Sequence, residues 1–462
     1  MFYLCIVIKT RLYIIEFLKG DKMKISDHFT WKKIILFTLP PISMMVFTSL
    51  YGVVDGFFIS NFVGETEFAA INFVLPIIMI LGSIGFMFGS GGSALIAKTI
   101  GEGNKEKANK IFSLLIYTVL IIGIIFSVTM FFALKPLLII LGADTNMIEP
   151  ALVYGKILLI TLPLFVLQFT FQNLIITSEK PTFGLIVTLI VGFTNIILDA
   201  LFIAIFKWGI YGAAAATAIS QSLGGIIPLI YYLRKNTSLL KLGKTTFDIK
   251  SILKTCLNGL SEFISNVAMS ILGIIFNAQL MKYYGEYGVS AYGVYMYVGF
   301  IFVAIFIGYV SGVAPIIGYN FGAKNTKELK NVFYKSLLFI SITSICMALC
   351  GVLLSKPLAY VFVSYNDDLF KLTEYVLKIS SLSFLFSGIN ILASSFFTAL
   401  NNGLVSAIIS FGRTIIFQTG LVIVLPFIFN ENGIWYSIVL SEIFSIIVSI
   451  TFLICNKRKY SY

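Results

Sequence analysis

The sequence predicts an all-α membrane protein with twelve transmembrane helices in two pseudo-symmetric six-helix lobes. Hydrophobic residues make up 58% of its 462 positions and charged residues only 12%, unlike the composition of a soluble globular domain. The apolar residues form runs of about 20 or more, the length that an α-helix needs to cross a bilayer. Because lipid-exposed backbone must satisfy its own hydrogen bonds, such continuous runs favour helices over the alternating strands of a barrel.

Twelve apolar segments are long enough to span. We place them at residues 33–60, 68–98, 111–133, 152–177, 183–205, 209–233, 252–281, 288–317, 332–354, 374–399, 404–429 and 433–455. An even number of crossings puts both ends of the bundle on the same side. We therefore expect a multi-pass protein of the cell membrane, in contact with membrane lipid.

The N-terminal segment, 1–30, precedes the first span and need not contribute to the fold. Residues 1–22 mix apolar and basic positions and are too short and interrupted to span. One interpretation is disorder or a start assigned too early, with Met23 as the true start. The other is an amphipathic helix on the membrane surface.

Basic residues gather in alternate connections. Lysines and arginines cluster at 105–110, 234–254, 324–335 and 457–459, whereas the other connections hold most of the loop acids. Because basic loops stay on the cytoplasmic side, we expect both termini in the cytoplasm. The net charge of +12 is then explained by topology, and no nucleic-acid partner is expected.

The chain contains an internal repeat, so that its second half matches its first at a fixed offset. IGEGNKEKANKIF at 100–112 aligns with FGAKNTKELKNVF at 321–333. Six helices per repeat make the two halves parallel, related by an axis along the membrane normal. We expect a first lobe at 31–233, a cytoplasmic linker at 234–251, and a second lobe with a basic C-terminus at 252–462.

Two acids and an amide lie inside apolar runs of the first half: Asp55, Asn195 and Asp199. An ionised carboxylate in the bilayer costs several kcal/mol, so such residues usually line an ion or substrate path. The alternative is that burial keeps both carboxyls neutral within a static core. The pattern favours a transporter.

Three charged residues lie near mid-depth of the second half: Glu262, Arg413 and Glu442. In one interpretation Arg413 neutralises one or both acids as a structural ion pair. In the other, Glu262 belongs to a substrate or proton path. Both remain open from the sequence.

The sequence lacks the motifs for ATP hydrolysis, for a catalytic triad and for metal binding by cysteine. No G-x-x-x-x-G-K-[ST] loop for ATP is present, and the single histidine, His28, cannot supply a Ser-His-Asp arrangement. The five cysteines lack metal-ligand spacing. We expect neither an enzyme nor a cofactor; a membrane-embedded enzyme is the weakest hypothesis.

Four segments together resemble the multidrug and toxic compound extrusion (MATE) family. They are PPISMMVFTSLYGVVDGFFISNFVG at 40–64, NIILDALFI at 195–203, GIYGAAAATAISQ at 209–221 and PIIGYNFGA at 315–323. The resemblance runs from about residue 25 to residue 459, in the order and spacing typical of the family. Among its branches, the bacterial and archaeal type is the most similar.

The resemblance implies secondary active multidrug efflux. Amphiphilic, often cationic, drug-like compounds would be exchanged for Na⁺ or H⁺ by alternating access, and we expect a monomer. The cation or proton site would comprise Asp55, Asn195, Asp199 and Thr217, with Pro40 as a hinge in the first helix. The glutamate that another branch of the family carries in its seventh helix resembles Glu262. The runner-up function is a flippase for lipid or lipid-linked oligosaccharide with the same two-lobe plan, which would need a strongly cationic cavity.

Helix geometry supports one site in the outer half of the first lobe. At a rise of about 1.5 Å per residue, Asp55 and Asp199 lie at similar depths, and Asn195 shares a face with Asp199 one turn deeper. Small residues at 212–218 would let the sixth helix approach closely enough for Thr217 to join. Oxygen ligands of this kind suit a hard cation such as Na⁺ or a shared proton.

Overall fold

The computed structural model describes residues 23–462; residues 1–22, and with them the alternatives for the N-terminus, lie outside the described part. The first lobe follows the irregular segment 23–30. It consists of α2 (Trp31–Phe62), α3 (Glu65–Gly101), α4 (Lys105–Ile140), α5 (Thr145–Thr177), α6 (Pro181–Asp199), the π-helical turn η2 (Ala200–Ile205) and α7 (Gly209–Leu233).

The second lobe begins after an irregular connection. It consists of α8 (Ile249–Gly322), α9 (Thr326–Leu353), α10 (Ser355–Val363), α11 (Asp367–Ser381), α12 (Phe384–Ala399), α13 (Gly403–Phe411), the π-helical segment η3 (Gly412–Gln418), α14 (Thr419–Val424), α15 (Pro426–Phe429) and α16 (Asn432–Tyr460). Within residues 23–462 no strand occurs.

Twelve membrane crossings can be counted in the described chain. Ten helices are long and apolar enough to span, and α11 with α12, bent by 46°, forms an eleventh. The 74-residue α8 contains two crossings, because Gly285 leaves helical geometry at φ 62° and ψ −148° and the chain turns back there. Gly285 carries no Cβ and adopts a positive φ at little cost. The predicted fold class is therefore confirmed.

The helices extend beyond the apolar runs from which they were predicted. Asn104 and Asn325, at matching positions of the repeat, both act as N-caps: the side chain of Asn104 accepts from the Lys107 N–H and that of Asn325 from the Glu328 N–H. These caps start α4 and α9 in polar sequence, several residues before hydrocarbon is reached. Hydropathy marks the membrane-embedded part of a helix and does not detect such caps.

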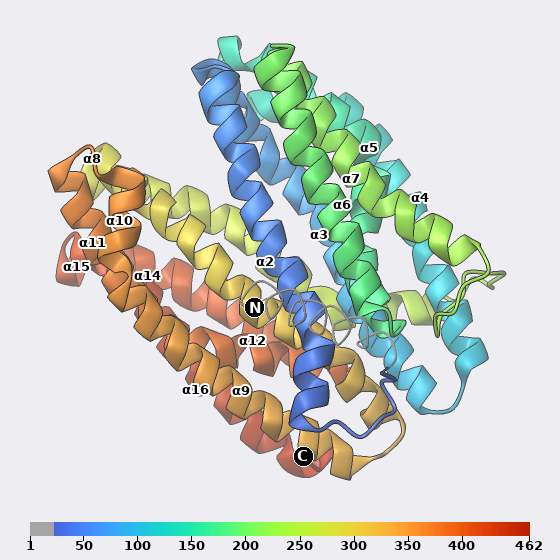
Figure 1. Ribbon diagram of the computed structural model, residues 1–462. Coiled ribbons are helices and arrows are strands. Elements are labelled where there is room, and N and C mark those ends of the chain that lie inside the picture. Colours follow the sequence, from blue (N-terminus) through green and yellow to red (C-terminus); the bar gives the residue numbers. More distant parts are fainter. Residues whose placement is uncertain (1–22) are drawn as a thin grey trace, which may run out of the picture.

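The two lobes pack together at one face of the molecule. We call it the terminal face, because it holds residues 23–30, the α3–α4 and α8–α9 connections and the C-terminus (Figure 1). Here a Cβ on Gly101 would overlap the Tyr319 carbonyl, and a Cβ on Gly322 would overlap the Lys98 carbonyl. Gly101 and Gly322 occupy matching positions of the repeat, and so do Lys98 and Tyr319. Glycine thus permits backbone contact between α3 and α8 in a two-fold arrangement.

At the opposite face the lobes diverge like the arms of a V. Figure 1 shows the far end of α2 separated from the bend of α8 and from α10. Contacts between the lobes are made mainly by α2 and α3 on one side and by α8 on the other, with smaller contacts between α3 and α12 and between α5 and α8. The molecule is therefore closed at the terminal face and splayed at the other.

Candidate functional site

Three helices of the first lobe bring four predicted residues together. Asp55 lies on α2, Asn195 and Asp199 on the last turns of α6, and Thr217 on α7. The Asp55 carboxyl faces both Asp199 and Asn195 across the α2–α6 contact. Asp199 is fully buried, and Asn195 and Thr217 are nearly so.

Small side chains allow these helices to approach. A Cβ on Gly192 of α6 would lie 2.8 Å from the ring of Tyr51 on α2, so a larger residue would force these two helices apart. On α7, a Cβ on Gly212 would lie 3.0 Å from the Phe202 carbonyl. The alanines that follow Gly212 on α7 are mostly buried. Close packing of small residues is what brings polar groups on separate membrane helices into one layer.

Most oxygen atoms of this cluster have no hydrogen-bond partner. Oδ1 of Asp55, Oδ1 of Asn195, both carboxyl oxygens of Asp199 and Oγ1 of Thr217 are buried and form no hydrogen bond of normal geometry within the described chain. Unpaired buried oxygens cost about 1 to 3 kcal/mol each. Two neighbouring carboxyl groups with an amide and a hydroxyl form a set of oxygen ligands that suits a hard monovalent cation or a shared proton.

Sequence reasoning missed two tyrosines beside the cluster. Tyr154, on α5, is buried with its side chain against Thr217 and near both aspartates. Tyr51, on α2 one turn before Asp55, is close to that carboxyl. Phenolic hydroxyls can donate to a carboxylate, so they extend the polar layer. Spacing on α2 could have revealed Tyr51, because i and i+4 share a helix face; nothing local marks Tyr154.

A π-helical turn follows the cluster. η2 begins at Ala200, directly after Asp199, and in the second lobe η3 carries Arg413. π-Helical turns inside α-helices occur frequently at functional sites, because they offset the side chains that follow. Each lobe therefore has a π-helical segment at an ionisable residue, Asp199 in the first lobe and Arg413 in the second. Hydropathy does not predict these segments.

In the second lobe Arg413 pairs with Glu442. Arg413 Nε and Nη2 both donate to Oε1 of Glu442, at 2.8 and 2.6 Å. Asn390 Nδ2 donates to the other oxygen at 2.8 Å, and Ser449 in turn donates to Asn390 Oδ1. The acid of this pair is well buried and fully hydrogen-bonded, which is the arrangement expected of a structural ion pair.

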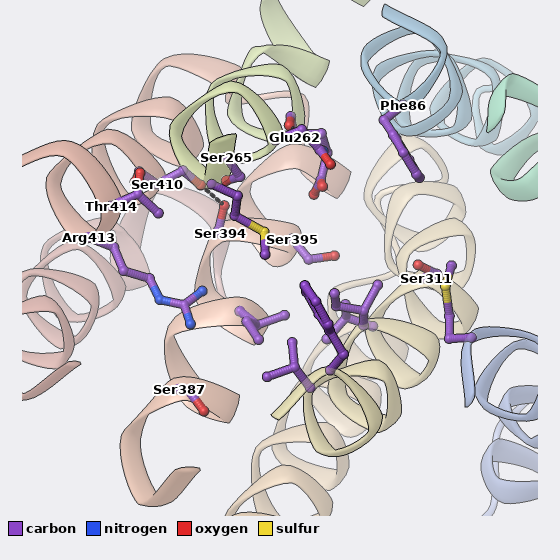
Figure 2. A pocket seen from close by; sticks show the side chains of 18 of the residues that line it. Phe86, Glu262, Ser265, Ser311, Ser387, Ser394, Ser395, Ser410, Arg413 and Thr414 are labelled. Carbon is purple, nitrogen blue, oxygen red and sulfur yellow. Dashed lines mark hydrogen bonds between the residues drawn. The ribbon is translucent and has the colours of Figure 1, made fainter. Parts of the chain in front are cut away.

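Glu262 forms no salt bridge with any described residue. It lines a cavity of about 350 Å³ between the lobes, with hydroxyl, aromatic and methionine side chains around it. Figure 2 shows Glu262 and Arg413 reaching toward this space from α8 and η3, while Phe86 of α3 faces it from the first lobe. The cavity thus contains one carboxyl group that is not neutralised by direct contact.

Pro40 lies inside α2 and is followed by Pro41, and both are buried. Two consecutive prolines remove two backbone donors, so the carbonyls of Leu36 and Phe37 lose their helical partners. A Cβ on Gly308 of α8 would lie 2.7 Å from the Pro41 carbonyl. The weakened part of α2 therefore lies at the contact between the lobes.

Comparison with known proteins gives consistent results. The MatE family model matches residues 40–201 and 263–424, two segments of equal length that reproduce the internal repeat and together cover more than half of the chain. "Multidrug export protein MepA" of Staphylococcus haemolyticus (strain JCSC1435) is 27% identical over 414 residues, which cover 89% of this chain and 90% of that protein. The protein of the same name from Staphylococcus aureus (strain MSSA476) is 25% identical over 421 residues, 89% and 91% of the two chains.

Solved structures share the fold. An outward-facing multidrug resistance MATE family transporter of the MOP superfamily superposes with a TM-score of 0.87 at 22% identity, over 93% of this chain and 96% of that one. A MOP superfamily transporter from Pyrococcus furiosus, described as having a binding pocket of reverse polarity, gives 0.86 at 22% identity over the same shares. With the family match over most of its length, the twelve-helix two-lobe fold and the multidrug-export relatives, this chain belongs to the MATE family of multidrug efflux transporters.

Proposed function

We propose that this protein exports amphiphilic, often cationic compounds in exchange for Na⁺ or H⁺, by alternating access of the cavity between its lobes. The coupling ion is a transported substrate rather than a resident cofactor. The observation that carries the proposal is the first-lobe cluster, in which the carboxyl groups of Asp55 and Asp199 meet Asn195, with Thr217 on the neighbouring helix. Within residues 23–462, five oxygens of these four residues form no hydrogen bond of normal geometry. Among residues 23–462, no three His, Cys, Asp or Glu side chains come together as a group that could hold a metal ion.

The charges of the two aspartates in the cluster couple ion binding to the position of α2. When both carboxyl groups are ionised, Asp55 and Asp199 repel each other in a medium of low dielectric constant. A bound Na⁺ or an added proton removes most of this repulsion and lets α2 and α6 pack closely at this depth. The coupling ion thereby stabilises one arrangement of α2 over another, which is the differential affinity that a population shift requires.

α2 transmits this change toward the cavity. Its Pro40–Pro41 pair is the least hydrogen-bonded part of the helix and lies against α8. A change in packing near Asp55 can therefore tilt the outer part of α2 about this point. Met45, one turn beyond the prolines, lines the cavity, so such a tilt alters the shape of the space that holds the exported compound.

The side chains that line the cavity favour cationic substrates. Its lining includes two glutamates and one arginine, and that arginine is paired with Glu442, so Glu262 is the carboxylate left to attract a cation. Phe86, Tyr295 and Phe300 offer flat aromatic faces, and Met269 and Met296 are adaptable apolar contacts. This charge balance does not provide the strongly cationic cavity that the flippase alternative needs.

Transport by purified protein in proteoliposomes tests the proposal. Export of a planar aromatic cation such as ethidium is followed with an imposed Na⁺ gradient at equal pH, and separately with a pH gradient without Na⁺. We expect transport with at least one gradient and its loss when an ionophore dissipates that gradient. Equal transport without any gradient would contradict coupling.

The variant Glu262→Gln tests the role of the cavity carboxyl group in substrate binding, independently of the first-lobe cluster. We expect weaker binding of cationic compounds with little change for neutral ones, because the variant removes one charge from the cavity. Glu149→Gln, at an exposed position, is the matched control. An equal loss for cationic and neutral compounds would argue against Glu262 as a substrate carboxylate.

A further inference from the structure

A short segment before the first helix joins the two lobes. Residues 23–30, which we call the strap, run along the terminal face from the first lobe to the second and then enter α2. The side chains of Ile25 and Phe29 are 1% and 0% exposed. Two anchored apolar residues within five positions show that the strap packs into the molecule, although its sequence has no helical or hydropathic pattern.

Among the described residues, one hydrogen bond attaches the strap to the first lobe. The Ile25 N–H donates to Glu179 Oε1 at 2.8 Å. Glu179 lies in the turn between α5 and α6, outside the membrane spans. Burial raises the pKa of this carboxyl group, and the bond from Ile25 and the charge of Lys24 oppose that rise.

The attachment to the second lobe is denser. Glu328, in the first turn of α9, accepts the Phe29 N–H at 2.8 Å and lies 2.6 Å from His28 Nδ1. The Phe29 carbonyl accepts from Asn331 Nδ2 at 3.0 Å and from Lys335 Nζ at 2.8 Å. Four polar contacts therefore hold the strap to α9.

The beginning of α2 also lies on the second lobe. A Cβ on Gly312 of α8 would lie 2.9 Å from the Thr38 side chain, and Lys335 Nζ lies 5.9 Å from the centre of the Trp31 ring. Beyond the two prolines, α2 packs along α6 of the first lobe. The strap and the first turns of α2 thus form one unit that follows the second lobe.

We propose that residues 23–30 act as a latch on the terminal face, where release of Ile25 from Glu179 must accompany separation of the lobes. This inference rests on the alternating access proposed above. Because the second lobe holds the strap by more contacts, the Glu179 contact breaks first and the strap moves with α9. The latch stabilises the arrangement that is closed at the terminal face.

Distance measurements between spin labels test the latch without measuring transport. Lys107 and Lys327 are exposed residues near the starts of α4 and α9, one on each lobe at the terminal face. Cysteines at these two positions are labelled in the full chain after its native cysteines are replaced, since Cys346, Cys350 and Cys455 are exposed. Separation of the lobes at this face lengthens the distance between the labels.

Glu179→Ala removes the bond from Ile25, and Glu328→Ala removes two of the four contacts to α9, those with His28 and Phe29. We expect Glu179→Ala to raise the ratio of long to short distances about two- to tenfold, the factor that corresponds to one net hydrogen bond, and Glu328→Ala to raise it at least as much. Glu106→Ala is the matched control, since this acid occupies the first turn of α4 and pairs with Lys110 on the surface, away from the strap contacts described here. If Glu328→Ala does not fold, Lys335→Met removes the donor to the Phe29 carbonyl and retains the acid.

The outcomes separate this inference from the proposed function. Distances in the two strap variants that match those of the unmodified chain and of Glu106→Ala would overturn the latch. Distances that never respond to coupling ion or substrate in any variant would instead contradict alternating access. An increase confined to the strap variants supports the latch.

Discussion

Replacing Arg413 by leucine is expected to destabilise the second lobe strongly. The change removes both donors to Oε1 of Glu442, whose side chain is only 9% exposed, and leaves Asn390 as its remaining side-chain partner. An uncompensated buried charge of this kind costs about 3 to 5 kcal/mol. Since Arg413 itself is 23% exposed, we expect the lower part of this range.

Thermal unfolding of the purified protein provides the assay. For a chain of this length about 1 kcal/mol corresponds to a degree or more in Tm, so we expect a fall of at least about 3 °C. Lys378→Met is the matched control: its ammonium group lies 2.6 Å from Glu374, the same distance as Arg413 Nη2 to Glu442, but on an exposed helix face. That surface pair should contribute about 1 kcal/mol or less.

A double substitution completes the test. Arg413→Leu with Glu442→Met removes both charges together, and we expect it to recover much of the lost Tm, because no buried charge is left unpaired. An Arg413→Leu protein with the unmodified Tm would refute the assignment of this pair as structural. A double variant as unstable as the sum of its two single changes would refute the coupling.

Three further predictions concern α2 and its surroundings. Gly308→Ala should lower Tm by an amount equivalent to about 1 to 3 kcal/mol, because its Cβ would meet the Pro41 carbonyl. Gly273→Ala is the control, because a Cβ there would meet open space. Equal stability of the two variants would contradict the close contact at Gly308. A chain that begins at Met23 keeps the strap, so we expect it to insert and transport as well as the full chain; loss of insertion would show that residues 1–22 are needed. Pro40→Ala restores one backbone N–H donor to α2 and should reduce transport without lowering Tm. Pro228→Ala, in α7 and away from the contact between the lobes, should leave transport unchanged. Equal transport by the two variants would contradict a hinge at Pro40.

The fold could be predicted because hydropathy and the repeat act over long stretches. Apolar runs determine which segments cross the membrane, and the fixed offset of the repeat pairs the lobes. Around Gly285 the sequence predicts only a connection between two spans. In the structure both spans stay helical up to this glycine, and a single glycine in the sequence does not reveal this. Contacts of the strap escaped prediction because they join Phe29 to Glu328, which lies in the other half of the chain.

The candidate sites were predictable to different degrees. Asp55 and Asp199 stand out because acids are rare in apolar runs, and the structure brings them together. For Glu262, Arg413 and Glu442 the sequence shows three charges at similar depth, but the choice of partner depends on the angle between helices. The structure pairs Arg413 with Glu442 and leaves Glu262 facing the cavity.

Transport by carboxyl-to-amide variants of the first-lobe cluster tests the central claim most directly. Asp55→Asn and Asp199→Asn keep the shape of each side chain but remove the charge that a cation or proton would neutralise. We expect both proteins to fold, to bind exported compound, and to lose export against a gradient, while Asp144→Asn, an exposed N-cap of α5, exports normally because asparagine also caps helices. Uphill export by Asp55→Asn or Asp199→Asn at the unmodified rate would contradict the assignment of this cluster as the coupling site.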